Sequence, residues 1–178
     1  MNILFLTGMH RSGTSCLAGE LANAGLSVSG TLLPADAGNS KGYFEDPRLV
    51  SLHDQILHDN RSNWMDPVPL NPDWLEKSLA KGFDEKLADY LGEFEANEGY
   101  FLIKEPRLSR LLPLWQHVCK VHGHGAKLLH VWRNPLDVAD SLWRRNNIPI
   151  VHGLQLWARY NLDIFESPLH ILDPILDR

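Results

Sequence analysis

Short apolar runs recur along the chain, each bounded by turn-forming or polar residues. They lie at residues 3–6, 100–103 and 127–132, and each leads directly into glycine, proline or charged residues. Runs of this length between breakers are typical of strands that are buried on both faces of a sheet. The pattern therefore predicts three such strands, with a further short strand at residues 169–172.

Between these runs, apolar residues recur at helical spacing. The predicted helices cover residues 13–24, 47–59, 84–94, 114–121, 135–145 and 153–165. Pro47 and Pro135 fall in the first turn of their helices, where proline is tolerated. Residues 30–42 are rich in Gly, Pro, Asn and Ser and have no period, which predicts a long loop. The prolines between residues 67 and 72 predict another irregular segment.

Strands that alternate with helices predict an α/β fold of three layers, with a mostly parallel sheet and helices on both faces. The chain has 178 residues, which predicts a single domain over residues 1–178. Ligands of such folds bind beyond the carboxyl ends of the strands. The functional chemistry is therefore expected just after Leu6, Ile103 and Trp132.

The composition narrows the class of protein. Hydrophobic residues make up 44% and charged residues 22%, which is typical of a globular protein and not of a disordered one. A net charge of −5 argues against general nucleic-acid binding. Cys16 and Cys119 form no metal-ligand spacing, and neither a signal peptide nor a membrane span is evident. These features predict a cytoplasmic protein and leave its oligomeric state open.

The first predicted strand leads into a glycine loop that reads Gly-Met-His-Arg-Ser-Gly-Thr-Ser over residues 8–15. Two glycines five residues apart, between a strand and a helix, are typical of a phosphate-binding loop. Where a nucleoside triphosphatase has lysine after the second glycine, this chain has Thr14, and the cation is Arg11 inside the loop. The substitution favours metal-free transfer of an anionic group over ATP hydrolysis, although the glycines alone also suit a plain tight turn.

A second polar segment follows the third predicted strand. Arg133 stands at the strand end, and Ser141 lies two turns into the next helix. An arginine with a hydroxyl donor is a suitable phosphate clamp. Arg144 and Arg145, at the end of this helix, are explained equally well by a favourable interaction with the helix dipole.

Four segments together resemble the P-loop sulfotransferases, in particular the bacterial type with the motifs GxxRSGTS, GYFE, K-D/E-PR and RNPxDVxxSL. Here they stand at residues 8–15, 42–45, 104–107 and 133–142, so the resemblance covers nearly the whole chain. It implies a P-loop-type fold and an enzyme that transfers a sulfuryl group. The implied donor is 3′-phosphoadenosine 5′-phosphosulfate (PAPS), and no metal ion is expected.

The resemblance also implies roles for individual residues. The phosphosulfate would be held by Arg11, Ser12, Gly13, Thr14 and Ser15. Arg133 and Ser141 would hold the 3′-phosphate. The catalytic residues would be Glu45 as general base and Lys104, with Arg11, at the leaving oxygen. His10 is the rival base, because other branches of the family use a histidine.

Several questions stay open at the level of sequence. The acceptor is a hydroxyl or amine of a small molecule, carbohydrate, lipid or peptide, and one of the six tryptophans is expected to stack on adenine or line the acceptor pocket. Family members usually continue further, so we expect the chain to lack their C-terminal segment. The alternatives to a sulfotransferase are a truncated nucleotide-binding module with little activity and an ATP-dependent small-molecule kinase.

Overall fold

The protein is described here by a computed structural model, which describes residues 1–36, 39, 42–94 and 99–167. Within these residues the strands β1 (Asn2–Thr7), β2 (Tyr100–Lys104) and β3 (Gly125–His130) form one parallel sheet in the order β2-β1-β3. The predicted parallel α/β architecture is therefore confirmed. The predicted strand at residues 169–172 lies outside the described residues.

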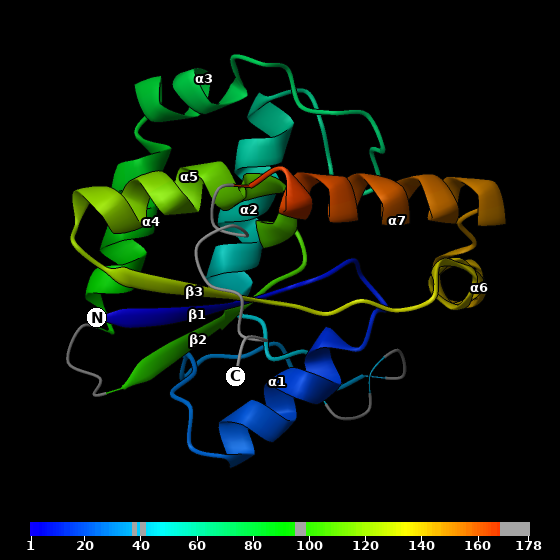
Figure 1. Cartoon of the computed structure of the whole chain (residues 1–178), viewed down its shortest axis with the longest axis horizontal. Helices are drawn as coiled ribbons and strands as arrows, with labels where there is room; N and C mark the ends of the chain where they lie inside the picture. The colour runs from blue at the N-terminus through cyan, green and yellow to red at the C-terminus, as the bar shows by residue number, and fades with distance from the viewer. Residues whose placement is uncertain (37–38, 40–41, 95–98, 168–178) are drawn as a thin grey trace.

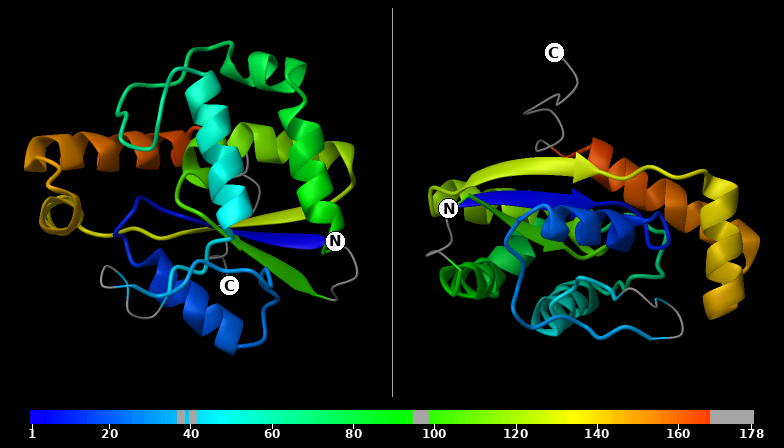
Figure 2. Two further views of the ribbon diagram at one scale, coloured as in Figure 1. Left: turned by 180° about the vertical axis from the view of Figure 1, so that it is seen from behind. Right: turned by 90° about the horizontal axis from the view of Figure 1, so that it is seen from below.

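Helices cover both faces of the sheet. They are α1 (Thr14–Asn23), α2 (Pro47–Asp59), α3 (Trp74–Ala80), α4 (Phe83–Gly92), α5 (Leu108–Val121), α6 (Pro135–Asn146) and α7 (Ile150–Phe165). Figure 1 shows α1 on one face and α2, α4 and α5 on the other. Seen from behind, the strands run between these two helical layers (Figure 2, left).

Alternating side chains along the strands explain this layering. Leu6 and Leu102 pack with Ala18 of α1, while Ile3 and Phe101 belong to the larger core formed with α2, α4 and α5. Successive side chains of a strand point to opposite faces, so a strand that is apolar throughout must be covered on both. The central strand β1 is buried in this way.

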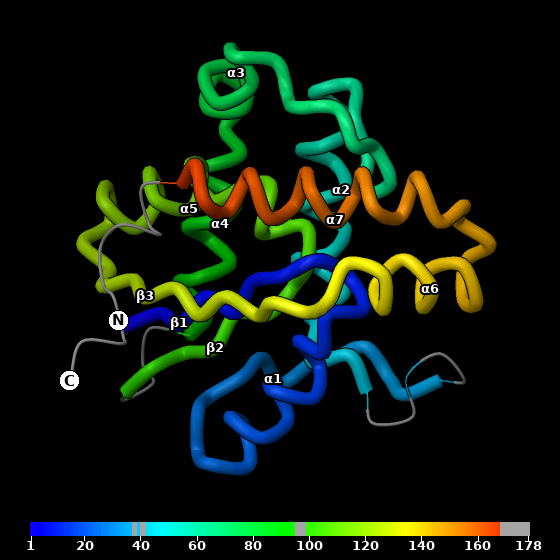
Figure 3. The backbone as a smooth tube through the Cα atoms, turned by 45° about the vertical axis from the view of Figure 1, so that its right-hand side comes forward, coloured from blue at the N-terminus to red at the C-terminus, as the bar shows by residue number. Residues whose placement is uncertain are grey.

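The far end of the sheet has a core of its own. Met9, just after β1, packs with Val138 and Leu142 of α6 and with Leu156 and Tyr160 of α7. Figure 3 shows α6 beyond the carboxyl end of β1, and Figure 1 shows α7 packed across it. This cluster ties the loop after β1 to α6, which brings residues far apart in sequence to one place.

One helix begins earlier than predicted, and another was not predicted. The helix predicted after Pro113 begins at Leu108 and contains that proline. Its first turn carries short-range bonds such as Ser109 N–H to the Pro106 carbonyl, and Leu108, Leu111 and Leu112 are fully buried, so core packing outweighs the lost hydrogen bond of the proline. Helix α3 is absent from the prediction because the prolines before it obscure its short apolar pattern.

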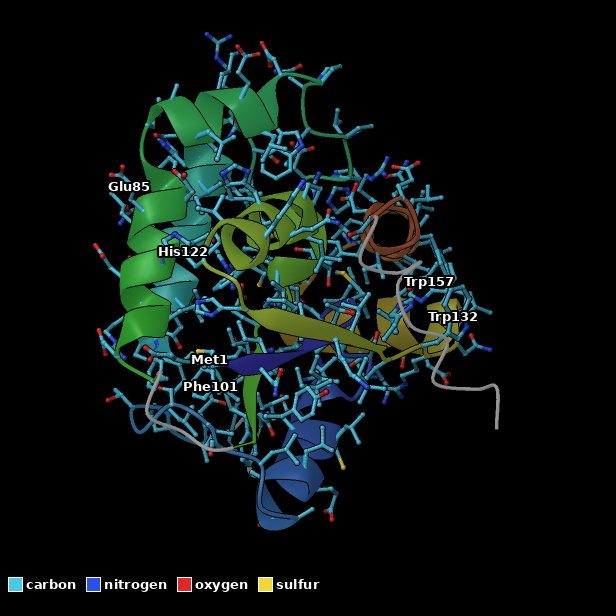
Figure 4. The ribbon with its side chains drawn as sticks, turned by 60° about the vertical axis from the view of Figure 1, so that its left-hand side comes forward. Met1, Glu85, Phe101, His122, Trp132 and Trp157 are labelled. Atoms are coloured by element: carbon cyan, nitrogen blue, oxygen red, sulfur yellow. The ribbon has the colours of Figure 1, made fainter. Side chains whose placement is uncertain are left out.

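The third strand ends earlier than predicted. β3 stops at His130, and Trp132 is 56% exposed, although the Val131 N–H still bonds to the Thr7 carbonyl. Trp132 packs edge-on against Trp157 with ring centroids 4.5 Å apart, and Figure 4 shows the two side by side. The chain then enters α6 through the predicted cap, where Asn134 accepts a hydrogen bond from the Leu136 N–H.

None of the described helices is long and apolar enough to cross a membrane.

Candidate functional site

The loop between β1 and α1 has the backbone of an anion-binding loop. Arg11 and Gly13 have left-handed conformations, with φ of 70° and 96°. A non-glycine residue in this region costs about 1–3 kcal/mol and is found mainly at functional sites. In the described residues, the N–H groups of Gly13, Thr14 and Ser15 have no hydrogen-bond acceptor. All three residues line one cavity, at the positive end of the α1 dipole.

Contacts on both sides fix the start of this loop. The Gly8 N–H donates to the buried Ser109 hydroxyl of α5 at 3.2 Å. A β-carbon on Gly8 would lie 2.8 Å from the Val131 carbonyl oxygen, so only glycine lets the loop approach β3 this closely. The loop is therefore held between two elements before any ligand binds.

Three arginines surround the loop on the α6 side of the cavity. Arg11 Nε donates to the Ser141 hydroxyl at 2.8 Å, and Arg133 Nη1 donates to the Arg11 carbonyl at 2.9 Å. Arg145 Nη2 donates to the Tyr43 hydroxyl at 2.8 Å. The cavity has a volume of about 600 Å³ and is rich in cations, although the chain as a whole carries −5.

Glu45 and Lys104 form a buried ion pair on the wall of the same cavity. The Lys104 ammonium also donates to the Ser15 hydroxyl at 3.1 Å and to the Tyr43 carbonyl at 2.9 Å. Burial raises the pKa of Glu45, which the Lys104 charge offsets in part. Burial lowers the pKa of Lys104, which Glu45 offsets in part. The pair thus joins the predicted base to the anion loop through Ser15.

His10 lies inside the loop against two aromatic rings. Its imidazole is 4.7 Å from the Trp64 ring and 5.8 Å from the Tyr160 ring, centroid to centroid. Burial, together with the nearby charge of Arg107, lowers the pKa of His10 to about 3. The imidazole is therefore neutral at physiological pH. Its Nε2 is buried and has no hydrogen-bond partner in the described residues.

A chain of buried hydrogen bonds leads from the core to Arg107. Trp115 Nε1 donates to His53 Nε2 at 3.0 Å, so the His53 proton lies on Nδ1, which donates to Glu105 at 2.5 Å. Glu105 in turn accepts from Arg107 Nη1 at 2.5 Å. Burial alone would raise the pKa of Glu105, but the His53 hydrogen bond and the Arg107 charge lower it to about 2. A permanently charged carboxylate therefore anchors Arg107.

Arg107 extends this chain to the cavity. Its Nε donates to Asp54 of α2 at 2.6 Å. Its Nη2 has no acceptor among the described residues, and the side chain lines the cavity.

The structure brings the predicted site residues together. The cavity is lined by Arg11, Gly13, Thr14, Ser15, Glu45, Lys104 and Arg133. Ser12 is a buried residue of the loop, and its N–H donates to the Met9 carbonyl. Ser141 does not line the cavity itself but contacts Arg11, which does. Ser141 thus contacts Arg11 of the loop, rather than Arg133 with which sequence analysis pairs it.

Further residues line the cavity without an individually predicted role, among them Tyr43, Trp64, Arg107 and Arg145. Arg145 had a usable signal, because it lies one turn after Ser141 and so on the same face of α6. For Trp64, the sequence predicts only that one of the six tryptophans stacks on adenine or lines the acceptor pocket, and not which one.

The rings of His122 and His124, between α5 and β3, lie 6.1 Å apart. Within the described residues, no group of three or more His, Cys, Asp or Glu side chains is arranged to hold a metal ion.

Comparison of the chain with protein-family models, with curated proteins and with solved structures finds no match.

Proposed function

We propose that this protein is a sulfotransferase that moves the sulfuryl group of PAPS to a hydroxyl or amine. The observation that carries the proposal is the loop after β1, where free N–H groups of Gly13, Thr14 and Ser15 share a cavity with Arg11, Arg133 and Arg145. A donor with anionic groups at both ends of its ribose matches a cavity with cations on several sides.

The Glu45–Lys104 pair suits the chemistry of transfer. Glu45 would take the acceptor proton as the acceptor oxygen or nitrogen bonds to sulfur and the bond from sulfur to the bridging phosphate oxygen breaks. The products are the sulfated acceptor and 3′,5′-adenosine bisphosphate. A protonated Glu45 attracts Lys104 less, so the lysine charge becomes available to the leaving phosphate oxygen at that moment. Arg11, in the loop itself, would share this role.

A kinase is the second candidate, because the loop has the glycine spacing of an ATP site. Thr14 stands where a nucleoside triphosphatase has its lysine, which argues against it. The third candidate is a binding module that holds the nucleotide but turns over slowly.

Thermal unfolding with two nucleotides separates these candidates. We expect 3′,5′-adenosine bisphosphate to raise the melting temperature, in EDTA as well as in magnesium. ATP with magnesium should raise it little. Stabilisation by ATP with magnesium, and not by the bisphosphate, would support the kinase and exclude the sulfotransferase. Binding of the bisphosphate without sulfate transfer from radiolabelled PAPS would favour the binding module.

A further inference from the structure

One wall of the cavity has polar atoms that the donor site does not use. His10, Trp64 and Arg107 line the cavity together with Val50 of α2 and Pro106. His10 Nε2 is buried and lacks a hydrogen-bond partner in the described residues, whereas Arg107 Nη2, which also has no acceptor there, is not a fully buried atom. A buried polar atom left unpaired costs about 1–3 kcal/mol, so such atoms indicate a missing polar ligand.

Arg107 and Lys104, the cations on this wall, are each already paired with carboxylates. Arg107 contacts two carboxylates, those of Glu105 and Asp54, and Lys104 is paired with Glu45. On the α6 side, Arg145 contacts the Tyr43 hydroxyl, which itself donates to Asp36, and Arg133 contacts a carbonyl, with Asp137 4.0 Å from its Nε. The three arginines there, Arg11, Arg133 and Arg145, outnumber these two carboxylates. An anionic ligand is therefore favoured on the α6 side, and a neutral one on the wall of His10 and Arg107.

We propose that His10 and Arg107 bind the acceptor, and that the acceptor is an uncharged polyol with a second oxygen near the one that is sulfated. This inference rests on the proposed function. Arg107 Nη2 donates to that second oxygen, and neutral His10 donates or accepts at Nε2. Glu45 lies on the same cavity and receives the proton of the reacting hydroxyl.

Other acceptor chemistries fit this wall less well. An acceptor with a single hydroxyl on an apolar body would leave His10 Nε2 without a partner and would not use Arg107 Nη2. A carboxylated acceptor would face the buried charge of Glu105 behind Arg107, and an amine would meet both Arg107 and Lys104. The Trp64 ring beside His10 offers an apolar surface to the carbon face of a cyclic polyol.

The buried hydrogen bonds that lead from Trp115 to Arg107 fix the position of the Arg107 guanidinium. His53 and Glu105 hold Arg107 by one side of its planar fork, and Asp54 holds Nε. The guanidinium then has one defined orientation, which reduces the entropy lost when it binds the acceptor.

Saturation-transfer NMR tests the proposal with four defined probes. They are methyl α-glucopyranoside, methyl β-galactopyranoside, sodium methyl glucuronoside as the carboxylated analogue, and 1-naphthol as the single-hydroxyl probe. Each is measured with and without 3′,5′-adenosine bisphosphate. We expect a neutral glycoside to bind, and to bind at least about 10-fold more tightly than the other two classes.

Two substitutions test whether the glycoside binds at His10 and Arg107. Arg107→Lys keeps the charge but loses the fork, and His10→Phe keeps the ring but loses both nitrogens. Each is expected to weaken glycoside binding by about 5-fold or more and to leave bisphosphate affinity within about 2-fold. The matched controls are Arg144→Lys, 77% exposed on α6, and His58→Phe, 90% exposed on α2. Neither control should change glycoside binding.

Three results would overturn the proposal while the sulfotransferase assignment stands. They are preference for 1-naphthol or for the glucuronoside, absence of glycoside binding in a protein that binds the bisphosphate, and unchanged glycoside affinity in both variants. Failure of the unmodified protein to bind the bisphosphate would instead count against the proposed function, whatever the glycosides do.

Discussion

At the scale of single residues, Arg11 and Arg133 are expected to act as one unit. Arg133 Nη1 bonds to the Arg11 carbonyl, so it holds the loop as well as offering charge to a ligand. Replacing either residue with alanine removes a charge-assisted contact and should weaken bisphosphate binding by about 1.5–3 kcal/mol. Because the two residues touch, the double variant should lose less than the sum.

Isothermal titration calorimetry measures both effects. Arg144→Ala is the control, because its guanidinium pairs with Asp140 on the exposed face of α6. Unchanged affinity in both single variants would contradict the anion site, and full additivity would contradict the coupling.

The second residue-scale prediction concerns Glu45. Glu45→Gln should lower turnover by about 10²–10⁴-fold and leave bisphosphate affinity nearly unchanged. Burial raises the pKa of Glu45, so kcat/KM of the parent should rise with pH as this carboxyl ionises. The variant should lose that acidic limb. Near-normal turnover in Glu45→Gln, with loss in His10→Ala, would assign the base to His10 instead.

His10 is the weaker base on physical grounds. A group with a pKa of about 3 holds a proton poorly near neutral pH, and the cations Arg107 and Lys104 oppose its protonation. Its unpaired nitrogen is better suited to a hydrogen bond with a neutral ligand.

At the scale of elements, α6 and α7 pack closely enough to control the site. A β-carbon on Gly153 would lie 3.0 Å from the Ala139 α-carbon, and α6 carries Ser141 and Arg145. Gly153→Ala should therefore displace α6 and weaken bisphosphate binding as well as stability.

Gly92→Ala is the matched control, because Gly92 is also helical and its β-carbon would meet no atom within 4 Å. Both variants gain the helix propensity of alanine. The difference between their unfolding free energies therefore measures the effect of the close contact between position 153 and Ala139. We expect Gly153→Ala to be less stable by about 1–3 kcal/mol in urea unfolding. Equal stabilities would show that the helices can move apart at no cost.

The helices and the anion loop show which parts of the fold and of the site can be predicted from the sequence. α2 matches its predicted range, because Pro47 and the apolar stripe give local signals for start and face. The start of α5 depends on burial of Leu108 and Leu111 in a core assembled from distant segments, which no local pattern contains. In the site, glycine spacing identifies the loop, whereas Trp64 and Arg107 reach the cavity only through the tertiary fold.

At the scale of the whole molecule, the burial of His10 in the anion loop makes the stability of the fold depend on pH in the acid range. In the unfolded chain histidine has a pKa of about 6.5, whereas the folded protein lowers that of His10 to about 3. As the pH falls below the pKa of histidine in the unfolded chain, His10 takes up a proton in the unfolded state but not in the folded state. The stability present above pH 6.5 is therefore lost progressively between pH 6.5 and pH 3.

Urea unfolding as a function of pH tests this coupling. The unfolding free energy of the parent should fall toward acid by up to about 1.4 kcal/mol per pH unit from this one group. His10→Phe should lose this part of the slope, and His58→Phe, whose ring is 90% exposed, should keep it. Glu105, whose pKa is lowered to about 2, also makes the unfolding free energy fall in acid, but only at the lower pH at which carboxyl groups of the unfolded chain take up protons. The two variants are therefore best compared between pH 4.5 and 6.5. Equal dependence of the unfolding free energy on pH in the parent and in His10→Phe would mean that His10 takes up a proton in the folded protein. The anion loop would then carry an additional positive charge in acid, and its affinity for an anion would change with pH.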